Sequence, residues 1–408
     1  MIHNIKIHNI NRYICSVALA LLMMPGEMNA QSDSVPDMSH GKTTAHAIGF
    51  DLRPSWVVPT NAFLRGDESG DRPVTAAVSP HIRYSFKFSP ETREGAWYPH
   101  AYQGVGISYT QFFKEAALGH PVNLYLFQGS RIASLSPKLS LDYEWNFGAS
   151  AGWKKFDPVD NPEHGPIGSR VNAYINLSIL LSYRIDSRWR LMAGVEGTHY
   201  SNGNTHFPNS GVNLVGGRIG LAYTIGEDRS GERPVAVDPF NPGMGYDLTV
   251  YGATRQRALV EYKGMVPEYI PGSFGVFGMN FAPMYSFNRY LRAGVSADFQ
   301  YDESANLGKY RVPGTMDEDI KFYRQPFNKR FSVGLSLHAE LTMPIFSINV
   351  GLGRNVIANG RDTEIFYQTL ALKAYIFKGA YLQAGYQLRD FHEPNNLMLG
   401  VGYTFGKR

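Results

Sequence analysis

The residues with the clearest chemical potential lie in the segment His199-Tyr200-Ser201-Asn202, which is followed at a short distance by Asn213. A serine hydroxyl next to a histidine, with a third side chain that orients the imidazole ring, is the arrangement used for nucleophilic hydrolysis. The alternative is that Ser201-Asn202-Gly203 is an ordinary turn signal at the end of a strand. The choice depends on the elements that position these side chains.

Those elements are predicted to be β-strands, because apolar and polar residues alternate along them. In the segment 331–342, Phe331 and every second residue after it are apolar, whereas Ser332 and every second residue after it are polar or glycine. The last segment, 397–405, repeats the pattern. Such alternation gives a strand one apolar and one polar face. In a membrane barrel the apolar face meets lipid and the polar face lines the interior.

The lengths of the connections favour a membrane barrel over a soluble sandwich. Very short turns are expected at 136–137, 186–187, 286–288, 343–344 and 378–379, and longer loops at 155–168, 200–210, 301–329, 354–364 and 389–395. Short turns at one end and long loops at the other are typical of outer-membrane barrels. After the N-terminus no apolar run reaches the ~20 residues that a membrane helix needs. The predicted fold is therefore all-β, an antiparallel transmembrane barrel of the outer membrane.

The number of barrels is left open by the sequence. We count about 16 strands (roughly 12–16), and a single large barrel is the first choice. Two eight-stranded barrels are the alternative, because the segments 220–226 and 400–406 are similar and each closes one half of the chain. The charged, proline-rich stretch 227–242 resembles a linker between residues 31–226 and residues 245–408.

The N-terminus is predicted to be a signal peptide, residues 1–30. Lys6 and Arg12 supply its positive region, 14–25 is apolar, and cleavage is expected after Ala30. This predicts export to the outer membrane of a Gram-negative bacterium. Cys15, the only cysteine, lies inside this segment, so we expect neither disulfides nor a cysteine-bound metal. A net charge of +4 without a basic stripe gives no reason to expect nucleic acid, and nothing in the sequence calls for a cofactor or a metal.

Strand alternation also predicts where the candidate chemistry lies. In the hairpin 189–225, the apolar face that begins at Trp189 continues through odd positions to His199 and Ser201, and Asn213 shares the parity of the apolar residues on the return strand. If the hairpin turns near His206, Asn213 lies across from His199. All three side chains would then face lipid near the outer leaflet, because the short turn at 186–187 would be periplasmic. Polar groups there are costly, and a nucleophile there would reach only membrane lipid.

These residues resemble the signature of lipid A 3-O-deacylases of the PagL type, also called acyloxyacyl hydrolases. The resemblance rests on 199–202, on 208–211 and on the glycine-rich return strand, about 25 residues in all (199–223). It implies a small outer-membrane barrel whose outer surface hydrolyses an ester of lipid A. It implies the nucleophile at Ser201 and the general base at His199, with Asn209, Asn202 and Gly203 as oxyanion or positioning residues.

The resemblance departs from the family at two places. The family's acid falls on Asn213, whose amide oxygen can still accept the His Nδ1–H but carries no full charge. The half 245–408 exceeds what the small family barrels contain, and no role is assigned to it.

The expected function is that of an outer-membrane serine esterase that removes an ester-linked acyl chain from lipid A, with lipopolysaccharide of the outer leaflet as its partner. Two alternatives stay open: a non-enzymatic barrel, either a pore or a surface-interaction protein, that keeps a relic motif, and an outer-membrane phospholipase. The sequence predicts neither the acyl chain nor the oligomeric state.

Overall fold

The computed structural model describes residues 43–407, apart from 68–71, 114–117, 158, 227, 229–238, 260–267, 271, 312–319 and 392. The predicted signal peptide, 1–30, lies outside the described residues. Within them, no helix is long and apolar enough to cross a membrane.

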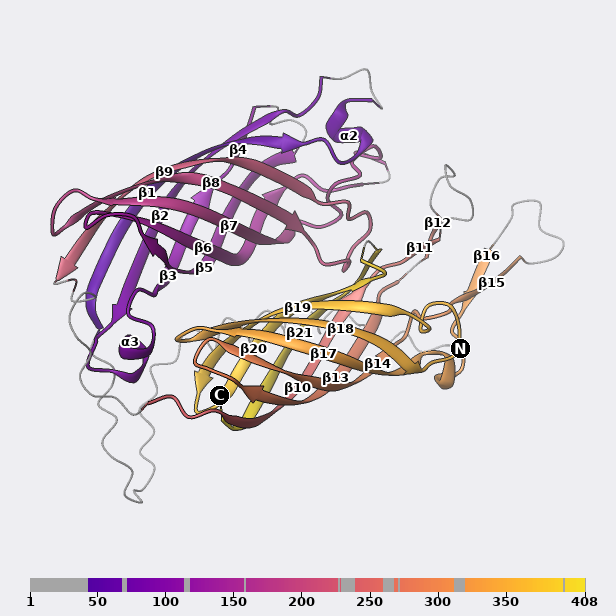
Figure 1. Ribbon diagram of the computed structural model, residues 1–408. Helices are drawn as coiled ribbons and strands as arrows, with labels where there is room; N and C mark the ends of the chain where they lie inside the picture. Colours follow the sequence, from indigo (N-terminus) through magenta and orange to yellow (C-terminus); the bar gives the residue numbers. More distant parts are fainter. Residues whose placement is uncertain are drawn as a thin grey trace, which may run out of the picture. The chain divides into compact units, whose positions relative to one another are not determined.

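The first half of the chain forms an eight-stranded antiparallel barrel (Figure 1). Its strands are β1 (Thr43–Val58), β2 (Ala76–Phe88), β3 (Tyr102–Tyr109), β5 (Gly119–Ser134), β6 (Leu139–Trp153), β7 (Val171–Arg184), β8 (Trp189–Ser201) and β9 (Val212–Gly226), and the two-residue β4 (Gln111–Phe112) continues β3 along β2. The barrel closes because β1 pairs with both β2 and β9. Two short helices, α2 (Ala62–Arg65) and α3 (Arg93–Trp97), lie in connections at its opposite ends.

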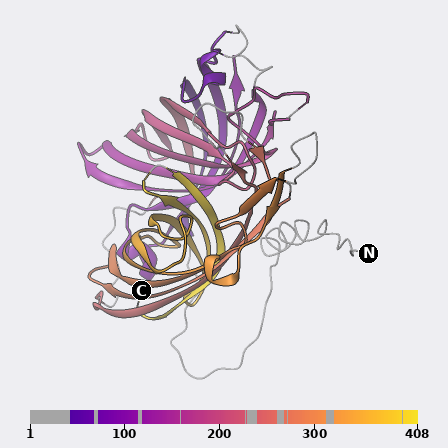
Figure 2. The same cartoon turned by 90° about the vertical axis from the view of Figure 1, so that its right-hand side faces the viewer.

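The second half forms another closed barrel of eight strands, seen from a second direction in Figure 2. These are β10 (Gly243–Arg255), β13 (Phe274–Ser286), β14 (Leu291–Asp302), β17 (Phe331–Thr342), β18 (Phe346–Ile357), β19 (Phe366–Phe377), β20 (Ala380–Arg389) and β21 (Glu393–Gly406). Its long loops carry the ribbons β11 (Ala258–Leu259) with β12 (Glu268–Tyr269) and β15 (Gly308–Arg311) with β16 (Ile320–Tyr323), and the 3-10 turn η2 (Phe327–Lys329).

The predicted all-β membrane-barrel fold is confirmed, in the form of two barrels rather than the single barrel that was the first choice. The deciding contacts are at the junction of the halves: β9 pairs with β1 and β10 pairs with β21. One large barrel and two small barrels have the same period-two alternation. The pattern indicates which face of a strand meets lipid, but not which strands pair to close the barrel. The expected asymmetry of the connections is present in each barrel, since all five short turns join strands at the same end as the start of β1 or β10.

The outer walls and the interiors differ as a membrane barrel requires. Outward side chains such as Val195 in β8 and Leu337 in β17 are about two-thirds exposed. The interior of the first barrel holds a buried network of three arginines and three carboxylates: Arg53, Arg83, Arg218, Asp51, Glu144 and Glu196. The second holds a smaller network of Asp247, Arg292, Glu340 and Lys373. Eight strands leave an interior that side chains can fill, and these networks fill it.

Candidate active site

The candidate residues lie on the hairpin of β8 and β9, at the long-loop end of the first barrel. His199 and Asn213 are direct partners in the register of the two strands, as the alternation predicted. His199, Ser201 and Asn213 are all partly exposed, whereas Thr198 and Tyr200, which alternate with His199 and Ser201 along β8, are buried in the barrel. The predicted placement of the trio on the outer wall is therefore confirmed.

His199 and Asn213 form a hydrogen bond. The Nδ1–H of His199 donates to Oδ1 of Asn213 over 2.7 Å. Because the partner is an amide oxygen, which only accepts, Nδ1 carries the proton and Nε2 of the neutral ring is left as an acceptor. Among the described residues no hydrogen bond joins Ser201 Oγ to this ring. Ser201 lies two positions further along the same face of β8, about 6.6 Å along the strand.

Tyr200 fixes this part of β8 from the inside. Its ring packs against Trp153 at 4.8 Å and Tyr174 at 5.5 Å between centroids, and its hydroxyl is 3.2 Å from Thr110 Oγ1. Asn123 Nδ2 donates to the same hydroxyl over 3.4 Å. A slip of one residue would expose this buried aromatic side chain and turn His199 and Ser201 inward. Tyr200 therefore holds its two neighbours in the outward orientation.

The three predicted oxyanion residues differ in whether their N–H groups already donate hydrogen bonds within the loop after Ser201. The N–H of Asn202 donates to Asn209 Oδ1 over 2.9 Å, and the buried Asn202 side chain donates from Nδ2 to the carbonyl of His206. The backbone N–H and the side-chain Nδ2 of Asn202 thus both help to close the loop. Within the described chain, the Nδ2 of Asn209 and the N–H of Gly203 donate to no other protein group. Gly203 takes a left-handed conformation with φ of 62°.

Gly211 ends the segment 208–211 on which the family resemblance rests, but the sequence predicted no role for it. It has a φ of 72°, and its N–H donates to the carbonyl of Pro166 over 3.0 Å. A Cβ at this position would lie 3.0 Å from His199 Cε1 and 2.9 Å from the carbonyl oxygen of Tyr200. Glycine lets the chain pass directly over the imidazole ring. Within the segment 208–211, the Ser210-Gly211 pair by itself indicates a turn and does not predict the contact with the ring.

The described residues offer no candidate metal centre beside this site. In the ranges of the chain that the structure describes, no group of three or more His, Cys, Asp or Glu side chains is arranged to hold a metal ion. His206, in the loop, is partly buried, and burial together with the Lys155 cation lowers its pKa. The carbonyl of His206, rather than its ring, accepts the hydrogen bond from Asn202 Nδ2.

Comparison with known proteins assigns each barrel separately. The family model for lipid A 3-O-deacylase (PagL) matches residues 48–222, and the model for the C-terminal domain of acyloxyacyl hydrolase matches residues 244–408. No curated protein matches the chain by sequence.

Several solved structures match part or most of the chain at low TM-scores. The outer membrane enzyme PagL is 13% identical with a TM-score of 0.27, over 44% of this chain and 98% of that chain. Neisserial surface protein A is 9% identical with a TM-score of 0.28, over 45% and 96%. The CymD monoaromatic hydrocarbon channel is 11% identical with a TM-score of 0.18, over 90% and 89%. Because these TM-scores are low, the assignment of the chain to a family rests on the two family models. With one model on each barrel, the chain belongs to the outer-membrane lipid A 3-O-deacylase (PagL) and acyloxyacyl hydrolase family.

Proposed function

We propose that the first barrel is a serine esterase that removes an ester-linked acyl chain from lipid A, with Ser201 as the nucleophile and His199 as the general base. The observation that carries the proposal is the outward His199–Asn213 hydrogen bond of 2.7 Å, with Ser201 on the same lipid-facing wall. A site on this wall takes its substrate from the outer leaflet, where lipid A lies. The family supplies the substrate class.

The chemistry follows from the state of the histidine. Nε2 of the neutral ring takes the proton of Ser201 Oγ as the oxygen attacks the ester carbonyl. The tetrahedral intermediate collapses when His199 returns this proton to the leaving alkoxide of the sugar, which leaves an acyl-enzyme. A water molecule then repeats both steps and releases the fatty acid. Since Ser201 and His199 are not hydrogen-bonded in the free protein, substrate binding has to bring Oγ to Nε2.

Asn213 is assigned the orienting role. Its Oδ1 fixes the ring and the tautomer through the 2.7 Å hydrogen bond. A carboxylate would also stabilise the imidazolium that forms in the transition state, whereas a neutral amide does so only through its dipole. We therefore expect turnover, at a lower rate than with an acid at the same position.

The oxyanion is assigned to the donors that the loop has not used. Asn202 is not assigned this role, because its side chain is buried and both its N–H and its Nδ2 already donate within the loop. The Nδ2 of Asn209 is held in place by the hydrogen bond that the same side chain accepts from Asn202. This amide and the N–H of Gly203 are the donors proposed to meet the developing charge.

A pore is disfavoured by the contents of the barrels. Arg53 and Arg218 cross the interior of the first barrel, and Arg292 crosses that of the second, each paired with carboxylates at 3.0 Å or less. A phospholipase would use the same residues on another ester, so it differs from the proposal only in substrate.

The test is mass spectrometry of lipids from cells that express the wild-type protein or the Ser201→Ala variant. Lipid A that lacks one acyl chain in the wild type alone supports the proposal. Lysophospholipid with unchanged lipid A would favour the phospholipase, and no change in either lipid would favour the relic. Ser187→Ala, in the exposed turn between β7 and β8, is the matched control and is expected to behave as the wild type.

A further inference from the structure

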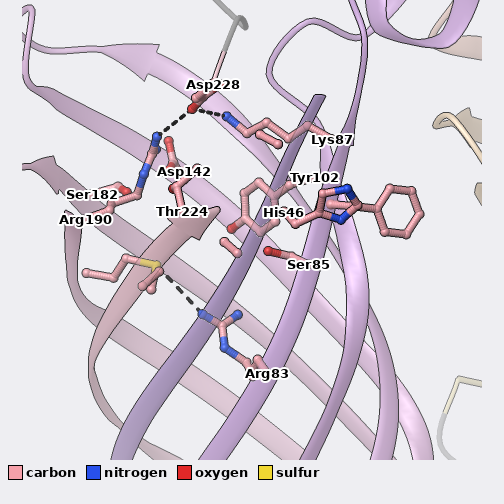
Figure 3. Close-up of a pocket in the computed structure, with 15 residues that line it drawn as sticks. His46, Arg83, Ser85, Lys87, Tyr102, Asp142, Ser182, Arg190, Thr224 and Asp228 are labelled. Atoms are coloured by element: carbon pink, nitrogen blue, oxygen red, sulfur yellow. Dashed lines mark hydrogen bonds and ion pairs between the residues drawn. The ribbon is translucent and has the colours of Figure 1, made fainter. Parts of the chain in front are cut away.

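The short-turn end of the first barrel contains two adjoining cavities, at the opposite end from His199 and Ser201. The smaller encloses about 60 Å³ and the larger about 290 Å³. Ser182, Arg190 and Asp228 line both. The larger one far exceeds the ~10–15 Å³ that a single water molecule needs. Figure 3 shows the smaller cavity, with Asp228 between Lys87 and Arg190 and with Asp142 facing the same space.

We call the two cavities together the basic mouth, because their lining carries more positive than negative side chains. Apart from Arg83, which belongs to the ion-pair network deeper inside, five cations and two carboxylates line it, so positive charge is in excess. The cations are Lys87, Arg131, Lys138, Arg184 and Arg190, and the carboxylates are Asp142 and Asp228. Burial and the nearby Arg131 and Lys87 cations lower the pKa of His100, which adds a neutral ring to the lining. A concave site with one sign of charge attracts counter-ions of the other sign.

Four buried polar atoms at these cavities have no hydrogen-bond partner among the described residues. The Oδ1 of Asp142 and the Oγ of Ser182 are buried and have no hydrogen-bond partner in the described chain, and both side chains are more than nine-tenths buried. The Nε of Arg131 and the Nδ1 of His100 are likewise buried without a partner there. Buried polar groups in proteins are nearly always satisfied. A ligand that satisfies these four must accept hydrogen bonds from Arg131 and donate one to Asp142.

Asp228 shows how the cations bind an anion. Its Oδ2 lies 2.8 Å from Lys87 Nζ and 3.3 Å from Arg190 Nη2 (Figure 3). It follows β9 in the chain and is not part of the barrel wall. The carboxylate of Asp228 thus forms ion pairs with two of the five cations, Lys87 and Arg190. In the described part of the molecule, Arg131, Lys138 and Arg184 have no ion pair with an acidic side chain.

We propose that this basic mouth binds a phosphate group that carries a hydroxyl donor. Its phosphate oxygens meet Arg190, Arg131 and their neighbours, and its hydroxyl donates to Asp142. Two sources share this chemistry: a free hydrogen phosphate ion of the periplasm, and the phosphoglycerol headgroup of an inner-leaflet lipid. Asp228 is an internal competitor for the same cations. The site is independent of the proposed esterase.

The first experiment is calorimetric titration of the full chain, in maltoside detergent, with inorganic phosphate and with sulfate at equal ionic strength. Phosphate is expected to bind saturably and more tightly than sulfate, which has no hydroxyl to donate to Asp142 at neutral pH. Arg190→Gln is expected to weaken phosphate binding about tenfold, the usual effect of losing one charge-assisted hydrogen bond. Arg188→Gln is the matched control, because Arg188 is exposed at the same end but lines neither cavity.

Two further variants keep the test independent of folding. Asp228→Asn removes the competitor and is expected to strengthen phosphate binding, a gain that an unfolded protein cannot give. Asp142→Asn is expected to remove the preference for phosphate over sulfate. The proposal is wrong if Asp228→Asn and Arg190→Gln both leave phosphate binding unchanged, or if Arg188→Gln weakens it as much as Arg190→Gln does.

The second experiment separates the two sources. The protein is reconstituted in vesicles of phosphatidylcholine with and without phosphatidylglycerol, and native mass spectrometry counts the lipids that stay bound. Phosphatidylglycerol that is retained by the wild type and lost in Arg190→Gln identifies the headgroup as the ligand. Tight phosphate binding without retained lipid identifies the free ion. If neither phosphate nor phosphatidylglycerol binds, the proposal is overturned; esterase activity is unaffected in every case.

Discussion

Each barrel contains a histidine whose Nδ1 forms a hydrogen bond with an asparagine oxygen. In the first barrel this pair lies on the outer face of the wall, and in the second it lies on the inner face. In the first barrel His199 and Asn213 are 2.7 Å apart on the outer wall. In the second, His338 Nδ1 and Asn349 Oδ1 are 2.6 Å apart on the inside, and Ser336 Oγ lies 2.8 Å from His338 Nε2. The interior set is the more completely connected serine–histidine–asparagine chain.

The difference shows that access, rather than hydrogen bonding alone, decides which set can act on a lipid. Ser336 is only 5% exposed, and its hydroxyl donates to Asp298, which also accepts from Tyr367. That serine is held in a packed polar core. Ser201 has none of these bonds but lies on the wall that membrane lipid touches. Because neighbouring residues of a strand face opposite sides, moving either histidine by one position would transfer it to the other face of the barrel wall.

The largest expected effect comes from removing the two histidines in turn. His199→Ala is expected to lower turnover of lipid A by on the order of 10³-fold or more, because the general base is lost. His338→Ala is expected to leave turnover unchanged and to destabilise the second barrel by ~1–3 kcal/mol, because Asn349 loses a buried partner. Release of fatty acid by the purified variants measures the first effect, and urea unfolding the second. Equal losses of turnover would show that the comparison is wrong.

The next contrast concerns the buried ion pairs inside each barrel. Arg218→Met leaves Asp51 and Glu144 short of a cation, and Arg292→Met does the same to Asp247 and Glu340. Removing one partner of a buried pair costs ~3–5 kcal/mol, and we expect this loss in the barrel that carries the change.

Tryptophan fluorescence can report the unfolding of the first barrel separately from that of the second. All five lie in the first barrel half, at Trp56, Trp97, Trp145, Trp153 and Trp189. Arg218→Met is therefore expected to shift the unfolding transition seen by tryptophan fluorescence. Arg292→Met is expected to shift only the transition seen by circular dichroism. A fluorescence shift of the same size in Arg292→Met would mean that the barrels unfold as one cooperative unit.

The same substitution is expected to have opposite consequences in the two asparagines. Asn213→Asp gives His199 a charged partner and is expected to raise kcat about tenfold or more. Asn349→Asp places a second carboxylate where Nδ2 now donates to Glu340 Oε2 over 3.1 Å, so repulsion between like charges is expected to lower the stability of the second barrel. Initial rates at neutral pH and unfolding curves distinguish them. A slower Asn213→Asp enzyme would contradict the orienting role given to the amide.

The sequence predicted the wall of the site better than its loop. Period-two alternation placed His199, Ser201 and Asn213 outward and in register, because parity is set residue by residue along a strand. The division into two barrels was undecided, because closure depends on pairings between β9 and β1 and between β10 and β21 that no local pattern records. The use of Asn202 donors within the loop and the passage of Gly211 over the ring depend on loop conformation. The sequence did not predict the basic mouth, because polar residues at inward positions are the rule in barrels and do not by themselves indicate a binding site.

The smallest contrast concerns the glycines that lie against the two histidine rings. Gly211→Ala adds a Cβ 3.0 Å from His199 Cε1 at a φ of 72°, which costs ~1–2 kcal/mol for a residue other than glycine and pushes the ring away from Asn213. We expect a five- to tenfold lower kcat, equivalent to ~1–1.4 kcal/mol, with KM little changed. Gly351→Ala places a Cβ 2.7 Å from His338 Cε1 and 2.3 Å from Thr369 Oγ1. It is expected to lower the stability of the second barrel and leave kcat as it is. Steady-state kinetics of both variants decide the matter: a normal kcat in Gly211→Ala would mean that the position of the His199 ring is set by Asn213 alone.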